Sequence, residues 1–210
     1  TVIVVITICG DLHSIEKTLR SVDPVKDGLM SVILVNDGTD LRTLSLIEKY
    51  IKRYPQFSKI VSASAGKYSE SLSDTIKSSA ADYVVLFKSD IILPSGWAQQ
   101  LVIAGESDPT IGAISPLSNA ASCQSTSCAL KEILSDNDLS SWTQIEDVNH
   151  LLRSSISLRA IPYPVSGAFC LAVKRKTAER AGVHMSHFMA GNGAEVDACF
   201  RLKLAGLTCA

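Results

Sequence analysis

The first 90 residues alternate between short apolar runs, rich in β-branched residues, and longer segments whose apolar side chains recur with helical spacing. The runs TVIVVITIC (1–9), MSVILVNDG (30–38) and DYVVLF (82–87) lack the polar alternation of a half-exposed strand. We therefore expect both faces of these strands to be buried. Strands of this kind, separated by helices, form a mostly parallel sheet with helices on both faces, so the sequence predicts an α/β fold.

The segments between these strands are expected to be helical. Ser14 is expected to cap the first helix, whose apolar positions are Ile15, Leu19 and Val22. A second helix is expected over 41–53, a short third strand over 59–64, a helix over 69–79, another over 96–104 and a fifth strand over 110–116.

The second half of the chain is less regular. It contains a Ser-rich loop (115–128), a broken helical segment (130–153), a pair of strand-like runs (163–173), a helix near 175–181 and a last helix near 195–205. The apolar face of the last helix is expected to consist of Val196, Cys199, Phe200 and Leu204, with Gly206 ending it. We predict one domain over 1–210, divided into halves at 115/116, and expect the chain to be a piece of a longer protein.

Composition narrows the choice of partners and compartment. A net charge of −1 argues against a nucleic-acid footprint, and no apolar run approaches the ~20 residues that span a bilayer. The six cysteines form no C-x-x-C pair, which favours reduced thiols in a cytoplasmic protein, with a local Cys123–Cys128 bridge as the less favoured alternative. His184 and His187 have a spacing compatible with metal binding, but we expect two exposed loop histidines.

Polar residues follow the apolar strands where ligands bind in a parallel sheet, beyond the carboxyl ends. The first strand ends in Thr7, Ile8, Cys9 and Gly10, the second in Asn36, Asp37 and Gly38, and the strand over 82–87 is followed by Lys88, Ser89 and Asp90. No G-x-G-x-x-G follows the first strand, and the chain has no P-loop motif. A divalent cation on a carboxylate, Mg2+ or Mn2+, is then the expected means of holding a phosphate.

Each acidic candidate also has a purely structural interpretation. Asp37 stands in an Asn-Asp-Gly turn, and Asp90 can accept hydrogen bonds from the backbone that follows it. Glu195 in the first turn of a helix is favoured by the helix dipole whether or not it does chemistry. Asp197 and Arg201 stand four residues apart and can simply pair along that helix.

Taken together, these motifs resemble the family 2 glycosyltransferases over essentially the whole chain. The resemblance rests on VIVVITICGDLHSIEKTLRSV (2–22), VILVNDGT (32–39), ADYVVLFKSDIILPSGW (81–97), GAISPLSNAASCQS (112–125), VSGAFCLAVKR (165–175) and GNGAEVDACFRLKLAG (191–206). It implies a GT-A fold and an inverting transfer of a hexosyl group from a UDP-, GDP- or dTDP-sugar to a hydroxyl on a glycan, lipid or protein.

The resemblance also implies roles for individual residues. Asp90 would hold Mn2+ or Mg2+ against the donor diphosphate, and Glu195 would be the general base. The remaining donor-binding positions are Thr7, Cys9, Gly10, Asp37, Gly38, Lys88 and Ser89, and the acceptor-side positions are Ser166, Gly167 and Asp197.

Several positions depart from the family pattern. Lys88 replaces the first aspartate of the D-x-D motif, Leu72 and Ser73 replace an expected Arg-Asn pair, and Ala194 stands where an acid is usual. These departures favour an alternative, a degenerate domain that binds a sugar nucleotide or a partner without turnover. A nucleotidyltransferase is a third hypothesis, against which the missing Gly-rich loop after the first strand counts.

Overall fold

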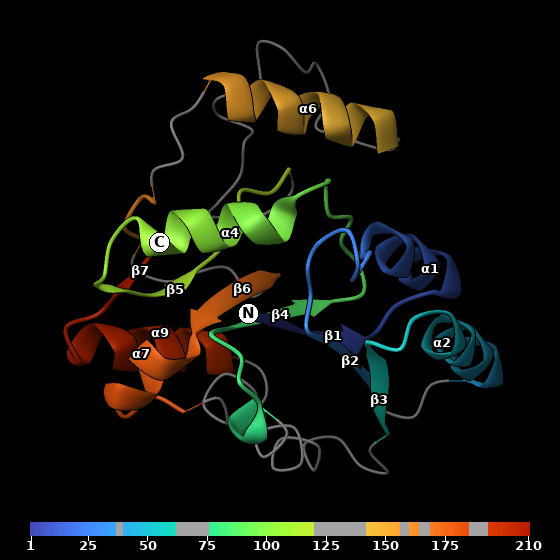
Figure 1. The fold of residues 1–210 in the computed structure, drawn as a ribbon, viewed down its shortest axis with the longest axis horizontal. Coiled ribbons are helices and arrows are strands. Elements are labelled where there is room, and N and C mark those ends of the chain that lie inside the picture. Colours follow the sequence, from blue (N-terminus) through green and yellow to red (C-terminus); the bar gives the residue numbers. More distant parts are fainter. Residues whose placement is uncertain (37–39, 62–75, 120–141, 156–159, 164–168, 185–192) are drawn as a thin grey trace.

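The structure, a computed structural model, describes residues 1–36, 40–61, 76–119, 142–155, 160–163, 169–184 and 193–210. Within these residues the chain forms a seven-stranded sheet in the order β3-β2-β1-β4-β6-β5-β7 (Figure 1). Only β6 runs antiparallel to its neighbours. The strands are β1 (Val2–Ile8), β2 (Ser31–Asn36), β3 (Phe57–Val61), β4 (Tyr83–Lys88), β5 (Ile111–Ile114), β6 (Cys170–Lys174) and β7 (Thr208–Cys209). The predicted α/β fold with a mostly parallel sheet is confirmed.

Helices cover both faces of this sheet. α1 (Leu12–Ser21), α2 (Leu41–Arg53) and α4 (Trp97–Glu106) pack on one face, and α7 (Arg175–Arg180) and α9 (Ala194–Leu204) on the other, while α6 (Trp142–Ser155) lies beyond α4 (Figure 1). Along β1, Val4 and Ile6 point toward the first layer and Ile3 and Val5 toward the second. All four are buried, which explains why the strand has no polar alternation.

The first helix begins earlier than the sequence predicts. Asp11, not Ser14, is its N-cap: one Asp11 carboxylate oxygen accepts hydrogen bonds from the backbone N–H groups of His13 (2.9 Å) and Ser14 (3.1 Å). The Ser14 hydroxyl donates to the other oxygen at 2.7 Å. These hydrogen bonds lower the pKa of Asp11, because they favour its ionised form. The prediction of Ser14 was wrong since the ionised Asp11 offers a stronger acceptor three residues upstream.

The last helix presents a different face to the sheet from the one predicted. Ala198, Cys199 and Leu202 are buried, whereas Phe200 is 50% and Leu204 is 88% exposed. Val196 is also exposed, so of the four predicted core positions only Cys199 lies in the core. Ala198 and Leu202, which were not predicted, complete the buried face with Cys199, so the helix is rotated relative to the predicted orientation.

Other boundaries agree with the sequence to within a few residues. Helix α2 spans Leu41–Arg53 as predicted, and β3 begins at Phe57, two residues before the predicted start. Of the predicted helix over 69–79 only 76–79 is described, and 76–78 is helical. Within the predicted strand pair over 163–173, the described residues form β6 and a bridge between Tyr163 and Cys209. Residues 130–141 lie outside the described residues.

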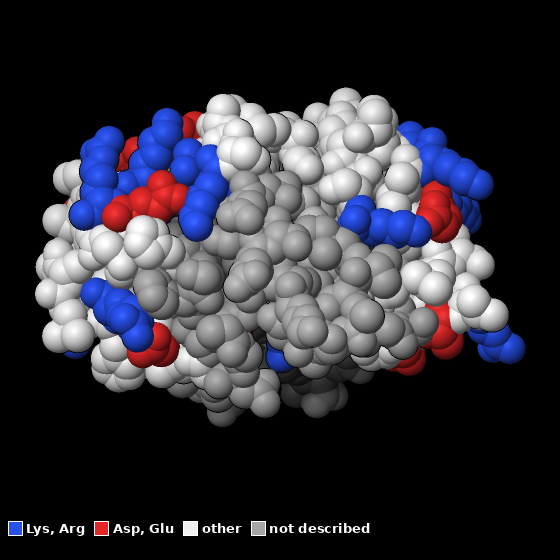
Figure 2. Space-filling model, turned by 90° about the horizontal axis from the view of Figure 1, so that it is seen from below, with Lys and Arg blue, Asp and Glu red and all other residues white. Residues whose placement is uncertain are grey.

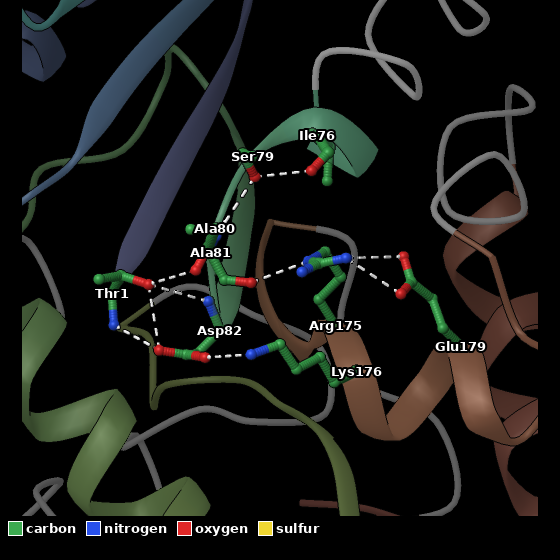
Figure 3. A network of polar contacts seen from close by, with 9 residues as sticks. All are labelled: Thr1, Ile76, Ser79, Ala80, Ala81, Asp82, Arg175, Lys176 and Glu179. Atoms are coloured by element: carbon green, nitrogen blue, oxygen red, sulfur yellow. Dashed lines mark hydrogen bonds and ion pairs between the residues drawn. The ribbon is translucent and has the colours of Figure 1, made fainter.

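A polar network closes the amino edge of the sheet, where the parallel strands begin (Figure 3). The buried Arg175 donates from Nε to the Ala81 carbonyl at 2.8 Å and pairs with Glu179 at 3.0 Å. Lys176 pairs with the Asp82 carboxylate at 3.2 Å. Asp82 also accepts from the Thr1 amino group, and these hydrogen bonds hold its pKa at about 2. The network joins α7 to the start of β4, at the end of the sheet opposite to the predicted site.

Candidate functional site

The parallel register brings the carboxyl ends of three strands into line. Thr7 of β1 pairs with Val35 of β2 on one side and with Lys88 of β4 on the other. One residue further on, Ile8 pairs with the buried Asn36 at the end of β2. Asp37 and Gly38, the predicted nucleoside contacts that follow Asn36 in the chain, lie outside the described residues.

The Ser89 side chain joins the ends of β1 and β4 through two hydrogen bonds to the Cys9 backbone, an arrangement that we call the Ser89 lock. Its hydroxyl oxygen accepts a hydrogen bond from the Cys9 backbone N–H at 2.8 Å and lies 2.8 Å from the Cys9 carbonyl, to which it donates. The Ser89 N–H donates to the Thr7 carbonyl at 3.0 Å. Ser89 is fully buried, so water does not compete for these hydrogen bonds. Gly10, directly after this lock, has a φ of +88°, which favours glycine.

Two charged side chains flank this buried serine. Lys88 and Asp90 are both exposed, and within the described part of the chain neither forms a hydrogen bond or an ion pair. Strand alternation places the Lys88 side chain on the same face as Thr7, because Val84 and Leu86 pack on that face before it. This is the face that α7 and α9 cover.

The backbone after Asp90 is held by α1 rather than by the Asp90 carboxylate. The buried Thr18 hydroxyl donates to the Ile91 carbonyl at 2.6 Å, and the Leu93 N–H donates to the buried Ser21 hydroxyl at 3.2 Å. The structural interpretation of Asp90 was that its carboxylate accepts hydrogen bonds from the backbone that follows it. In the described residues that backbone donates to α1 instead, and the carboxylate accepts no hydrogen bond from it. Its lone pairs remain available to a ligand at the carboxyl edge.

Glu195 lies at the start of α9, and the packing of this helix shows at which edge that start is found. Leu202 packs over Gly112, where an added Cβ would lie 3.0 Å from a Leu202 methyl carbon. One turn earlier, the Cys199 carbonyl lies 3.9 Å from the Cys209 sulfur. Cys209 pairs with Ala113, nearer the carboxyl end of β5. The helix thus runs from the carboxyl edge toward the amino edge, and Glu195, one turn before Cys199, lies toward the carboxyl edge.

The order of the strands separates the end of β4 from Glu195, which starts the helix that packs over β5. β6 separates β4 from β5, over which α9 packs, so the two strands stand about 10 Å apart at ~4.8 Å per strand. Glu195 is half-exposed and, among the described residues, has no hydrogen-bond or ion-pair partner. The structure therefore brings Thr7, Cys9, Lys88, Ser89 and Asp90 together on two adjacent strand ends, with Glu195 approaching the same edge from one face.

Asp197 is engaged in the pair that its spacing predicted. Its carboxylate accepts from the Arg201 Nε at 2.6 Å, and both side chains are about half-exposed. Ser166 and Gly167, the other acceptor-side candidates, lie outside the described residues. So do His187, Cys123 and Cys128, Leu72 and Ser73.

The donor atoms at the edge suit one kind of metal coordination. Among the described residues no three His, Cys, Asp or Glu side chains converge on a common point. A single exposed carboxylate, Asp90, fits the position of one protein ligand to a hard cation whose other ligands are diphosphate and water oxygens. Mg2+ is bound in this manner in phosphate-transfer sites, through one or two carboxylates and substrate oxygens.

None of the described cysteines is in a disulfide bond. Burial raises the pKa of Cys170 to about 12, and a hydrogen bond with Cys199 together with burial raises that of Cys209. Cys9 is the half-buried one, at the site, and contributes its peptide group rather than its sulfur to the Ser89 lock. The role of Ser89 as a buried tether had no signal in the sequence, because it depends on a contact between residues 80 positions apart.

Solved structures with the same fold are glycosyltransferases of the GT-A type. A mannosyltransferase from Pyrobaculum calidifontis, PcManGT, in complex with GDP-Man and Mn2+ aligns with a TM-score of 0.59 at 18% identity, over 99% of this chain and 53% of that one. GalNAc-T7 with UDP, GalNAc and Mn2+ aligns with a TM-score of 0.64 at 10% identity, over 100% of this chain and 41% of that one. The chain thus spans about half or less of the length of these structures.

The family follows from the sequence itself. The model of glycosyl transferase family 2 matches residues 3–119, more than half of the chain, and the chain belongs to this family. A comparison with curated proteins found no match. In the described part of the chain no helix combines the length and the apolar character needed to cross a membrane.

Proposed function

We propose that this domain is an inverting glycosyltransferase that moves a hexosyl group from a nucleotide sugar to a hydroxyl of a glycan, lipid or protein. The observation that carries the proposal is the Ser89 lock, which presents Lys88 and Asp90 from a rigid strand end in a family 2 domain. The complexes of the two structural neighbours, with GDP-Man or UDP and with Mn2+, support a donor and a cation of these classes.

The donor is assigned to the carboxyl edge of the sheet. Thr7, Cys9 and Gly10, with Asp37 and Gly38, bind the nucleoside, and Lys88, Ser89 and Asp90 lie at the diphosphate. Asp90 would hold Mn2+ or Mg2+, and the bound ion would supply a Lewis acid that offsets negative charge on the nucleoside diphosphate. Ser89 keeps the strand end in place through its bonds to Cys9, so this stabilisation needs little reorganisation.

Glu195 is the proposed general base. Its carboxylate would take the proton from the acceptor hydroxyl as that oxygen attacks the anomeric carbon. Attack from the side opposite to the leaving diphosphate inverts the configuration at that carbon. Ser166, Gly167 and Asp197 are assigned to the acceptor side. The proposal treats 1–210 as one catalytic domain, with a nucleotide-sugar half (1–115) and an acceptor half (116–210).

The setting proposed for this chemistry is the cytoplasm. Cys170, Cys199 and Cys209 are buried and form no disulfide within the described residues, which supports a reducing compartment. A second candidate function, a domain that binds the donor without turnover, is favoured by Lys88 and Ala194, which replace two acids of the family pattern.

A nucleotide-release assay separates these functions. Purified protein is mixed with UDP-, GDP- and dTDP-sugars, Mn2+ and a panel of acceptors. We expect turnover that falls at least about 100-fold in Asp90→Ala and in Glu195→Ala, while Asp147→Asn, an exposed carboxylate on α6, keeps it. Donor binding without turnover for every acceptor would favour the binding domain. Formation of a nucleotide sugar from a sugar phosphate and a nucleoside triphosphate would favour a nucleotidyltransferase.

A further inference from the structure

Lys88 occupies a position where its charge changes how an anion can be held. It is the last residue of β4, in register with Thr7, and its backbone is fixed on both sides by the β1 ladder and by the buried Ser89. Asp90 is two residues further on, in the turn that directly follows the strand. A positive and a negative side chain therefore stand on either side of the buried Ser89, at the same end of β4.

The two charges do not neutralise one another. No ion pair joins Lys88 to Asp90, and neither side chain has another partner in the described ranges. Elsewhere in those ranges cations close to carboxylates are paired with them: Lys176 pairs with Asp82 at 3.2 Å and Arg201 with Asp197 at 2.6 Å. The ammonium group of Lys88 is thus available to an external anion at the edge where the donor is proposed to bind.

Charged groups on another face of the molecule are mixed. Seen from below, the coloured side chains include both signs side by side on each flank of the molecule (Figure 2). The net charge of the whole chain is −1. Long-range attraction therefore does little to concentrate a diphosphate at the site, and short-range contacts must provide the affinity.

Lysine at this position has opposite effects on a cation and on a phosphate. A second carboxylate would strengthen the binding of a divalent ion beside Asp90, whereas an ammonium group at the same strand end repels it. The same ammonium group attracts the diphosphate oxygens directly, as a compact point charge with three donors. Replacing an acid with Lys88 therefore moves part of the charge compensation from the ion to the protein.

We propose that Lys88 binds the donor diphosphate directly and gives this enzyme a component of nucleotide affinity that does not require a metal ion. This inference rests on the proposed function, since it assigns the diphosphate to the same edge. Lys88 touches the leaving group, so it also stabilises the charge that the nucleoside diphosphate carries away. The alkyl stem of Lys88 lies on the face that α9 covers, so the ammonium group approaches the diphosphate from the same side as Glu195.

The test measures nucleotide binding rather than turnover. UDP and GDP, with uridine and guanosine as uncharged counterparts, are titrated into the protein by calorimetry, in EDTA and in Mn2+. In EDTA we expect the wild-type protein to bind one diphosphate with an affinity that falls as salt is raised. We expect Lys88→Gln to lose at least about 10-fold of that affinity while the nucleoside affinity changes by less than about twofold.

Three variants sharpen the comparison. Lys88→Arg should keep most of the metal-free affinity, and Lys88→Asp should lose it while increasing the gain in affinity that Mn2+ brings. Lys203→Gln removes an equally exposed lysine from the far end of α9 and should change nothing. Because Lys88 is exposed, none of these changes is expected to unfold the protein, which thermal denaturation verifies.

The outcomes separate the inference from the function on which it rests. Equal diphosphate affinity of the wild-type protein and Lys88→Gln in EDTA, with Mn2+-dependent binding and turnover intact, overturns the role of Lys88 and leaves the glycosyltransferase standing. Metal-free binding that Lys88→Gln loses, in a protein without turnover for any acceptor, supports the role of Lys88 and overturns the enzyme. Absence of any diphosphate binding with or without Mn2+ overturns both.

Discussion

The hydroxyl group of Ser89 forms hydrogen bonds with both backbone polar groups of Cys9. It accepts from the Cys9 N–H and donates to the Cys9 carbonyl, each at 2.8 Å. These residues belong to different strand ends and are 80 positions apart in the chain. One buried side chain thereby couples the segment Cys9–Gly10 to the segment Lys88–Asp90. Together with the β1–β4 ladder, this pair holds the proposed nucleoside and diphosphate contacts at a fixed separation.

Replacing Ser89 with alanine should loosen the site and weaken the fold together. The change leaves the Cys9 N–H and carbonyl without their partner, and we expect it to lower the free energy of unfolding by about 2 kcal/mol. Nucleoside diphosphate affinity should fall as well, since the two segments lose their fixed spacing. Chemical denaturation and calorimetry measure the two effects.

The control for this change is Ser107→Ala at the end of α4. The exposed Ser107 hydroxyl makes one hydrogen bond, to the Ala104 carbonyl, at 2.6 Å, and its loss should cost less than about 0.5 kcal/mol. Unchanged diphosphate affinity in a stable, folded Ser89→Ala protein would show that the lock does not position the site.

The two acids at the start of α9 should affect different kinetic constants. Glu195→Gln keeps the size of the side chain but removes the base, so we expect kcat to fall at least about 100-fold with donor affinity unchanged. Asp197→Asn breaks the ion pair with Arg201, which is worth at most about 0.5 kcal/mol, and on the proposed acceptor side it should mainly raise the KM for the acceptor. A Glu195→Gln enzyme with normal kcat would remove Glu195 from the chemistry.

Gly105 is required by its contact with Tyr83. An added Cβ would lie 2.6 Å from the Tyr83 hydroxyl oxygen. The Tyr83 side chain is buried, and its hydroxyl group donates a hydrogen bond to the Glu106 carboxylate at 2.5 Å. Although alanine is favoured over glycine within a helix by about 1 kcal/mol, we expect Gly105→Ala to be destabilising by about 1–2 kcal/mol because the buried ring has to move. A double-mutant cycle tests this by measuring the free energy of unfolding of Gly105→Ala in the wild-type protein and in Tyr83→Phe. The destabilisation by Gly105→Ala should be smaller in Tyr83→Phe, and an equal destabilisation would show that the clash is not with the Tyr83 hydroxyl.

Asp27 should make the stability depend on pH. Burial raises the pKa of its carboxyl group, which accepts from the Trp97 indole N–H at 3.1 Å and from the Asp23 N–H at 3.2 Å. The folded state therefore binds the proton more tightly than the unfolded state, whose carboxyl titrates near ~3.9. The contribution of Asp27 to the free energy of unfolding is therefore largest at low pH, near and below the pKa of the unfolded carboxyl group. It is lost as the pH rises through the raised pKa of the folded state.

Asp27→Asn removes this titration while its amide oxygen still accepts from Trp97. We expect the variant to be at least as stable as the wild-type protein at about pH 7 and to lose that relative advantage by about pH 4, close to the ~3.9 at which the unfolded carboxyl group titrates. Urea unfolding followed by tryptophan fluorescence at both values tests this, with Asp147→Asn as the exposed control. Parallel pH profiles of the wild-type protein and Asp27→Asn would contradict it.

Much of the architecture is encoded locally. The unbroken apolar runs of β1, β2 and β4 predicted strands buried on both faces, and the spacing of Ile47 and its neighbours predicted the bounds of α2, because these patterns arise from residues adjacent in the chain. The parallel arrangement then placed the carboxyl-edge residues Thr7 and Lys88 side by side, as the register shows. The roles of Glu195, Asp90 and Asp37 remain predictions.

Contacts between distant segments decided the rest. Helical spacing could not tell which side of α9 faces the sheet. Phe200 and Leu204 have the spacing of core residues but are exposed, whereas Ala198 and Cys199 are buried. Nothing local marks Ser89 as the residue that joins two strand ends, or separates Lys88 from the partnered lysines of the opposite edge. Periodicity reports the chemistry of neighbours in sequence, whereas burial and pairing depend on what the folded chain brings from elsewhere.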